Sequence, residues 1–173
     1  MDINELKKLK SEIGFDGNED AKDSEIELIQ LVSFKLDNVE YGVNIMVVDE
    51  ILRYPQITRV PNTPDFIKGV INLRGNVIPV IDVRKRFGLS KTKVSDLTRI
   101  IVVEIEEKYV GLLVDNVHQV VRMSPSEIDP PSSLLEGVSE DFISGIGRLK
   151  DRLIVIIKIG YILLDDDINA VAS

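Results

Sequence analysis

The chain has 173 residues, enough for one sizeable hydrophobic core or two small cores that share a boundary. Its 23 Ile and 21 Val against 3 Ala form a β-branched composition that favours strands over a helical bundle. With 21 Lys and Arg against 29 Asp and Glu, the net charge of −8 repels nucleic-acid phosphates and anionic lipid surfaces. Cysteine is absent, which excludes disulfides, thiolate metal sites and a cysteine nucleophile. The composition therefore predicts a mostly β protein that binds no nucleic acid.

The first 27 residues form an acidic segment that differs from the rest of the chain. They carry 9 acidic and 4 basic side chains. Ile3, Leu6, Leu9 and Ile13 recur at near-helical spacing, and the polar sequence DGNEDAKDSE follows. We expect residues 1–27 to be a flexible tail with a frayed helical turn and a disordered linker. Neither a signal-peptide pattern nor an apolar stretch long enough to cross a bilayer is present, which predicts an intracellular protein without membrane insertion.

From Leu28 onward, short β-branched stretches alternate with turn residues. The sequences LVSFKL with DNVEYG, and IIVVEI with EEKYVG, each predict a hairpin. The strongest feature is an internal repeat, since residues 65–83 (DFIKGVINLRGNVIPVIDV) reappear at residues 141–159 as DFISGIGRLKDRLIVIIKI. A weaker match pairs Gly42 with Gly111. A unit of about sixty residues is close to the lower limit for an independent core, so we expect the two copies to pack together.

The repeated hairpins predict two small, closed or nearly closed β-barrels related by a pseudo-twofold axis, because closure removes exposed sheet edges. We expect a first subdomain at about residues 28–90 and a second at about 95–160. Helices should be short and local. The capping and stop signals place them at residues 63–67, at 82–87 before Gly88, at 124–127 with capping-box spacing, and at 161–170 near the C-terminus.

Familiar catalytic motifs are absent: the sequence has no GxSxG elbow, no P-loop, no GxGxxG after a strand and no HExxH. His118 is the only histidine and has no second His or Cys as a metal partner, so a structural role is favoured. Asp65 and Asp141 recur in the repeat and raise the alternative of an acid-dependent hydrolase with paired carboxylates, but capping of a helix start explains them sufficiently. The run Asp165–Asp167 lacks the spacing of a calcium loop. We therefore predict no enzyme activity, no cofactor and no metal site.

Arg74 is the polar residue that folding explains least. In NLRGNVIPVID, the residues Gly75 and Asn76 suit a tight hairpin turn, and such a turn does not need a guanidinium before it. Two interpretations stay open. Arg74 is either simply solvated, or it is a forked donor that grips the backbone carbonyls or a carboxylate of a partner.

The sequences YGVNIMVVDEI and TRVPNTPDFIKGVINLRGNVIPVIDVRKRFG closely resemble the CheW family of bacterial chemotaxis coupling proteins, over roughly residues 29–164. The resemblance implies two SH3-like, five-stranded β-barrel subdomains around a shared hydrophobic seam, with no active site. It implies a cytoplasmic adaptor, recruited to membrane receptor arrays, that joins the cytoplasmic tip of methyl-accepting chemoreceptors to the regulatory domain of a CheA-type histidine kinase. The same domain occurs within CheA itself, so a regulatory domain detached from a histidine kinase is a further alternative.

Carried over residue by residue, the resemblance implies two contact surfaces. The receptor-facing groove would include Val48, Glu50, Arg74, Ile100 and Val120. Arg74 would supply an oriented polar group on aliphatic ground, and burial in the core is the rival interpretation for the valines. The kinase-facing edge would include Arg53, Tyr54 and Ile57 from the first copy, and Ile128, Asp129 and Leu134 from the second.

Overall fold

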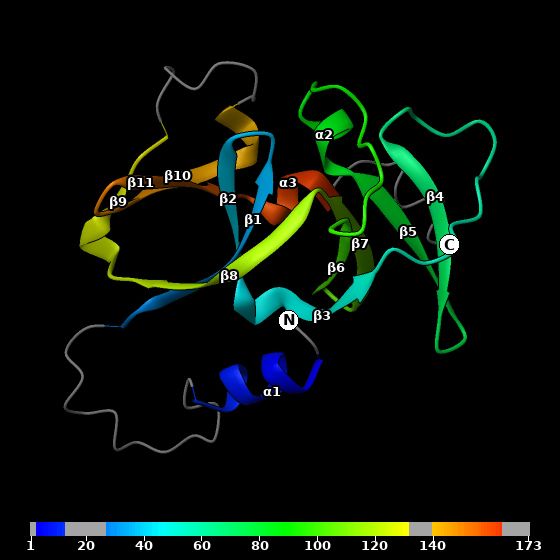
Figure 1. Ribbon diagram of the computed structural model, residues 1–173. Coiled ribbons are helices and arrows are strands. Elements are labelled where there is room, and N and C mark those ends of the chain that lie inside the picture. The colour runs from blue at the N-terminus through cyan, green and yellow to red at the C-terminus, as the bar shows by residue number, and fades with distance from the viewer. Residues whose placement is uncertain (1–2, 13–26, 132–139, 164–173) are drawn as a thin grey trace.

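The computed structural model describes residues 3–12, 27–131 and 140–163, which form two β-sheets and several short helices (Figure 1). The strands are β1 (Ile29–Leu36), β2 (Val39–Asn44), β3 (Val48–Arg53), β4 (Ile67–Leu73), β5 (Asn76–Asp82), β6 (Arg99–Ile105), β7 (Lys108–Val114), β8 (Asn116–Met123), β9 (Ile128–Asp129), β10 (Ile143–Leu149) and β11 (Arg152–Ile157). The helices are α1 (Ile3–Glu12), α2 (Val83–Arg86) and α3 (Ile159–Leu163), with 3-10 turns η2 (Ile45–Val47), η3 (Pro125–Glu127) and η4 (Glu140–Phe142). The prediction of a mostly β fold with short helices is confirmed, as are the four predicted hairpins.

The two sheets take strands from both copies of the repeat. Sheet A has the order β8-β1-β2-β11-β10-β9, and sheet B has the order β3-β6-β7-β5-β4. The β1–β2 hairpin of the first copy thus lies between strands of the second, and the β6–β7 hairpin of the second lies between strands of the first. The two sheets therefore do not correspond to contiguous segments at 28–90 and 95–160, and sheet A has a sixth strand, the two-residue β9.

The exchange has a physical basis in the symmetry of the repeat. Strand β2 pairs in parallel with β11 in sheet A, and β7 pairs in parallel with β5 in sheet B. Gly42 and Gly111 occupy the same place in these two pairs, where an added Cβ would meet aliphatic side chains of neighbouring strands at about 3 Å. The two hairpins thus occupy equivalent places in the two sheets, and the repeat alone does not reveal which sheet each one joins.

Alternate residues of the same strand enter different apolar clusters, which explains why the strands are nearly continuous hydrophobic runs. In β6, Ile101 and Val103 face the seam cluster between the two sheets, whereas Ile100 and Val102 face a cluster inside sheet B. Sheet A has a matching internal cluster built on Leu31, Val121, Met123, Ile154 and Ile156. The shared hydrophobic seam predicted from the resemblance is therefore present, with a separate small core inside each sheet.

Aromatic rings line the middle of the seam. Phe34 stacks on Tyr41 with ring centroids 5.7 Å apart, Tyr41 meets Phe87 at 5.5 Å, and Phe87 meets Phe142 at 5.4 Å. Phe34 and Tyr41 come from sheet A, Phe87 follows α2, and Phe142 ends η4. Because such pairs add to the energy of burial, this row helps to fix one sheet on the other.

Four hairpins close with two-residue turns whose first residue has left-handed backbone geometry. These residues are Asp37, Arg74, Glu106 and Lys150, with φ between 45° and 56°. Leu73 pairs with Asn76, so Arg74 and Gly75 form the centre of the β4–β5 turn. The sequence analysis placed Gly75 and Asn76 there; the positive φ of both Arg74 and Gly75 shows that Arg74 itself is a turn residue.

The predicted helix signals are partly confirmed. Asp82 caps α2 by accepting from the Lys85 amide, and Gly88 follows with a φ of +80°. Ser124 and Glu127 form the expected capping box at η3. Residues 63–67 form a turn instead of a helix, closed by the Ile67 amide donating to the Pro64 carbonyl at 3.0 Å.

Both terminal helices differ in extent from the expectation. The first described segment is a ten-residue helix, α1, where the sequence analysis expected a frayed turn. Helix α3 begins at Ile159, two residues before the predicted start, and residues 164–170 of the predicted C-terminal helix lie outside the described residues. In the part of the chain that the structure covers, no helix is both long and apolar enough to span a membrane.

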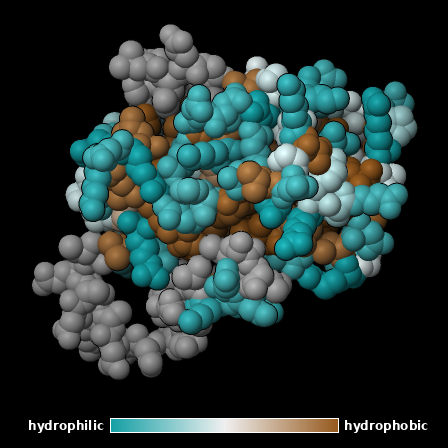
Figure 2. Space-filling view, viewed as in Figure 1, coloured by the Kyte–Doolittle hydropathy of each residue, from teal (hydrophilic) through white to brown (hydrophobic). Residues whose placement is uncertain are grey.

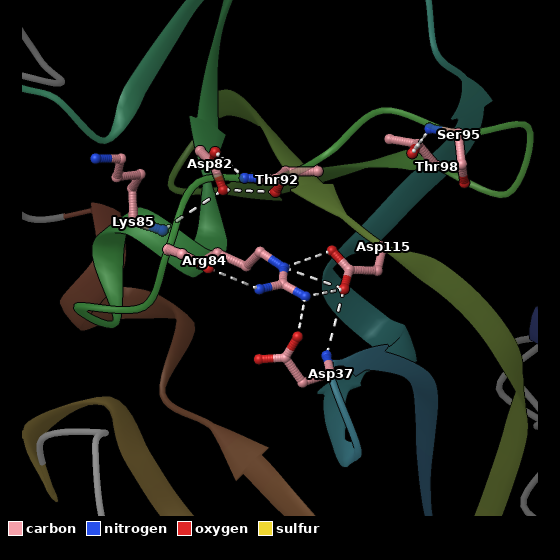
Figure 3. A network of polar contacts seen from close by, with 9 residues as sticks. Asp37, Asp82, Arg84, Lys85, Thr92, Ser95, Thr98 and Asp115 are labelled. Atoms are coloured by element: carbon pink, nitrogen blue, oxygen red, sulfur yellow. Dashed lines mark hydrogen bonds and ion pairs between the residues drawn. The ribbon is translucent and has the colours of Figure 1, made fainter.

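An ion-pair network joins the two sheets at one end of the seam (Figure 3). Arg84 on α2 donates from Nε to Asp115 Oδ1 at 2.8 Å and from Nη2 to Asp115 Oδ2 at 2.6 Å. Its Nη2 also pairs with Asp37 in the β1–β2 turn. The hydrogen bond to Asp115, together with that to Asp37, raises the pKa of Arg84 above its ordinary value. We call Arg84, Asp37 and Asp115 the clasp.

Candidate interaction surfaces

Arg74 is an exposed cation held in place by two acidic residues of β3. Its side chain is 62% exposed, and Nη1 donates to Glu50 Oε2 at 2.9 Å while Nη2 lies 3.5 Å from Asp49 Oδ2. The hydrogen bond to Glu50 raises the pKa of Arg74 above its usual value. Because a guanidinium carries five N–H donors, Arg74 can hold Glu50 and still donate to a partner.

Glu50 is the nearly buried partner that holds the guanidinium of Arg74 in place. Its side chain is only 4% exposed, and within the described residues its Oε1 accepts no hydrogen bond although it is buried. A nearly buried carboxylate needs a cationic partner, because an unpaired charge in such a place is strongly destabilising. The structure thus brings Glu50 and Arg74 together, as two of the five residues expected in the receptor-facing groove.

The three apolar members of that groove occupy different depths. Val48 is fully buried in the seam cluster, and Ile100 is fully buried in the cluster inside sheet B. Burial in the core therefore accounts for both side chains, and their direct contact with a partner stays a prediction. Val120 on β8 is half-buried against the seam cluster and remains accessible.

Tyr54 and Ile57, expected on the kinase-facing edge, lie in the segment that crosses from β3 to β4, the two outer strands of sheet B. We call the place where this segment crosses the open end of sheet B. Both are half-buried and pack against the cluster inside that sheet. The next residue, Thr58, exchanges two backbone hydrogen bonds with Val70 of β4, at 2.9 and 2.8 Å. Arg53 lies exposed at the end of β3, paired in register with Arg99 of β6.

Ile128 and Asp129 occupy the equivalent place on sheet A. They form β9, which pairs with Gly147 and Ile146 of β10. Ile128 packs against the cluster inside sheet A, and Asp129 forms an ion pair with Arg148 at 2.6 Å. Leu134 lies outside the described residues. The two expected kinase-facing sets therefore sit at corresponding ends of the two sheets.

Two glycines reveal this correspondence. A Cβ on Gly69 of β4 would lie 2.3 Å from the Thr58 carbonyl oxygen and 2.8 Å from Ile57 Cγ2. A Cβ on Gly145 of β10 would lie 2.8 Å from Ile128 Cγ2 and 3.0 Å from the Asp129 carbonyl oxygen. The repeat aligned these glycines, but only the structure shows that each accommodates a crossing segment.

Sequence reasoning missed Asp49 and the clasp. The adjacent acidic residues in VVDEI were a signal for a cation nearby, and Asp49 supplies the second contact to Arg74. Nothing in the repeat pointed to Arg84, because the position equivalent to it in the second copy is Gly160.

The residues considered for catalysis do not converge. Asp65 and Asp141 are both exposed and lead into β4 of sheet B and β10 of sheet A, so the paired-carboxylate alternative gains no support. His118 is exposed on β8. Among the described residues, no group of three or more His, Cys, Asp and Glu side chains could hold a metal ion. Asp165–Asp167 lie outside them.

Comparison with known proteins shows the same domain elsewhere. Residues 30–166 match the family of CheW-like domains. Chemotaxis protein CheW of Klebsiella aerogenes is 35% identical over 142 residues, covering 82% of this chain and 86% of that protein. The protein of the same name from Bacillus subtilis is 37% identical over 137 residues, covering 78% and 86%. The crystal structure of the scaffolding protein TtCheW from Thermoanaerobacter tengcongensis is similar with a TM-score of 0.74 and 40% identity, covering 80% of this chain and 90% of that chain.

Proposed function

This chain belongs to the family of CheW-like domains, and from that premise we propose that it is a non-catalytic adaptor of bacterial chemotaxis signalling. Its partners would be the cytoplasmic tip of a methyl-accepting chemoreceptor and the regulatory domain of a CheA-type histidine kinase, and it would act in the cytoplasm at receptor arrays. The observation that carries the proposal is Arg74, an exposed guanidinium fixed by a nearly buried carboxylate. A preset donor of this kind suits recognition of a partner, because little freedom is lost on binding.

The receptor-facing surface would use Arg74 as its polar anchor. Glu50 and Asp49 would orient the guanidinium, and Val120 would supply apolar contact. Val48 would act indirectly, because it is fully buried in the seam cluster two residues before Glu50 on β3. Helical partners bind such surfaces through a few apolar anchors and oriented polar groups.

The kinase-facing surfaces would be the open ends of the two sheets. Tyr54 and Ile57 would present an aromatic and an aliphatic anchor at the end of sheet B, with Arg53 beside them. Ile128 and Asp129 would do so at the end of sheet A, and Leu134 belongs to the same proposed contact. Two equivalent ends on one molecule would allow it to be held from both sides, which suits assembly into an extended array.

The alternatives have weaker support. A hydrolase needs converging carboxylates, and Asp65 and Asp141 lead into different sheets. A regulatory domain detached from a kinase would have the same CheW-like fold, but the relatives described above are CheW proteins, of which the chain covers 86% of the length, and a CheW scaffold.

The test is co-sedimentation of the protein with a receptor cytoplasmic fragment and a histidine kinase, scored by kinase activation. Arg74→Glu should weaken receptor binding at least about tenfold, because it replaces a donor by an acceptor beside Glu50. Kinase binding should stay unchanged. Tyr54→Ala should show the reverse, so each variant is the control for the other.

Arg74→Lys separates binding from stability. It keeps the charge beside Glu50 but loses the planar fork, so thermal stability should be retained while receptor affinity falls. Micromolar affinities are expected for the wild type, because array assembly supplies further avidity. Wild-type protein that neither binds the receptor fragment nor activates the kinase would refute the adaptor function.

A further inference from the structure

Helix α1 lies against β3, the strand that carries Val48 and Glu50 of the proposed receptor-facing surface (Figure 1). We propose that α1 is an intramolecular occupant of the apolar surface beside β3, and that an incoming receptor helix must displace it. The inference rests on the proposed function, because it concerns regulation of the same surface.

Among the side chains of α1 that the structure describes, residues 4–8, one is deeply buried. Leu6 is 1% exposed and is part of the seam cluster that also contains Val48, with Val120 packed at its margin. Its helical neighbours Asn4, Glu5, Lys7 and Lys8 are exposed. A buried leucine with exposed polar neighbours on the same helix is the pattern by which amphipathic helices bind grooves.

The surface beside α1 is apolar beyond the area that Leu6 covers. Figure 2 shows hydrophobic side chains gathered across the middle of this face, next to α1. Half-buried apolar residues that pack against the seam cluster include Val47 and Ile51 on the η2–β3 segment and Val117 and Val120 on β8. A helix of only ten residues can cover only part of such a surface, so a longer helix with several apolar anchors can replace it.

The strength of the contact is suited to reversible docking of α1. Burial of one leucine favours the docked state by a factor of about thirty. Ordering a helix of three turns offsets part of this factor, because short helices are marginal on their own. The docked state is then dominant but displaceable. The apparent affinity for a competing helix equals its intrinsic affinity multiplied by the fraction of molecules in which α1 is released.

The first test changes the anchor and leaves the rest of the chain intact. Leu6→Glu should strengthen binding of a receptor cytoplasmic fragment about three- to thirtyfold, while kinase binding stays at the wild-type level. Asn4→Glu introduces the same charge change on an exposed position of the same helix and should bind like wild type. Leu6→Ala should give a smaller gain in the same direction, and it serves if the glutamate disturbs the seam. Receptor affinity that stays equal or falls in both Leu6 variants would overturn the inference.

The second test follows α1 itself. The chain has no cysteine, so Lys7→Cys places a single fluorophore on the exposed side of the helix. A saturating concentration of receptor fragment should lower the fluorescence anisotropy of this label, because the released helix moves freely. An anisotropy that does not fall on binding would show that α1 and the receptor use different surfaces. If no form of the protein binds the fragment, the proposed function fails as well, and that outcome is distinct from normal receptor binding with an unmoved label.

Discussion

Gly69 offers a quantitative test of how the kinase-facing end of sheet B is built. A methyl group at this position would lie 2.3 Å from the Thr58 carbonyl oxygen, about 1 Å inside ordinary contact distance. The neighbour is backbone and cannot rotate away. Gly69→Ala must therefore push the crossing segment, with Ile57, off β4.

The expected loss is the sum of two effects. The displaced segment gives up the two backbone hydrogen bonds between Thr58 and Val70, each with a net value of about 1 kcal/mol. The φ of +153° at Gly69 adds about 1 kcal/mol of backbone strain for alanine. Gly69→Ala should thus lower the free energy of unfolding by about 3 kcal/mol.

Gly75→Ala is the matched control, because Gly75 also has a positive φ, of +86°, but nothing lies within 4 Å of an added Cβ. Gly75→Ala should lower the free energy of unfolding only by the backbone strain, about 1 kcal/mol. Urea unfolding of both variants gives the comparison, and the Gly69 variant should also bind the kinase more weakly because Ile57 has moved. Free energies of unfolding that agree within about 0.5 kcal/mol would refute the close approach of Thr58 to β4.

Three further predictions concern the interior. Burial, with a smaller effect of Asp37, raises the pKa of Tyr41, so the stability that the neutral Tyr41 hydroxyl contributes is present below pH 10 and is lost as the pH rises further. Between pH 9 and pH 11, Tyr41→Phe should therefore lose less free energy of unfolding than wild type. Parallel losses of the two proteins in urea unfolding would contradict this. Arg84→Met should lower the free energy of unfolding by about 2 kcal/mol because it opens the clasp, whereas Lys85→Met on the same helix should leave it nearly unchanged in urea unfolding. Equal losses in the two variants would mean that the clasp does not stabilise the fold. Asp82 accepts from the amide and hydroxyl of buried Thr92, so Asp82→Ala should speed amide exchange in residues 88–98, and unchanged exchange would argue against this tether.

The parts of the fold that local sequence encodes were predictable. The hairpins, the cap at Asp82 and the capping box at Ser124 depend on neighbours within a few residues. The exchange of hairpins was not predictable, because β1 pairs with β8 through contacts such as Leu31 with Val121, and the repeat offers each hairpin two equivalent places.

The candidate surfaces show the same division. Arg74 stood out because no turn requires its side chain, and the structure adds the reason for its orientation in Asp49 and Glu50. The full burial of Ile100 could not be foreseen, since a continuous apolar run such as IIVV does not reveal which face of a strand is enclosed. Leu6 could not be recognised as a buried residue, because the partner surface for α1 is assembled by residues distant in sequence.

The interlaced sheets also set an order of events during synthesis. Sheet B is complete once β7 has emerged at Val114, but sheet A needs β11, which ends at Ile157. Until then, the first hairpin has only β8, which is complete at Met123, as a neighbouring strand of sheet A. The β2 edge of this hairpin therefore stays without its parallel partner until β11 has been made. Such late, long-range pairing is the kind that slows folding, and it leaves a strand edge exposed to association in the meantime.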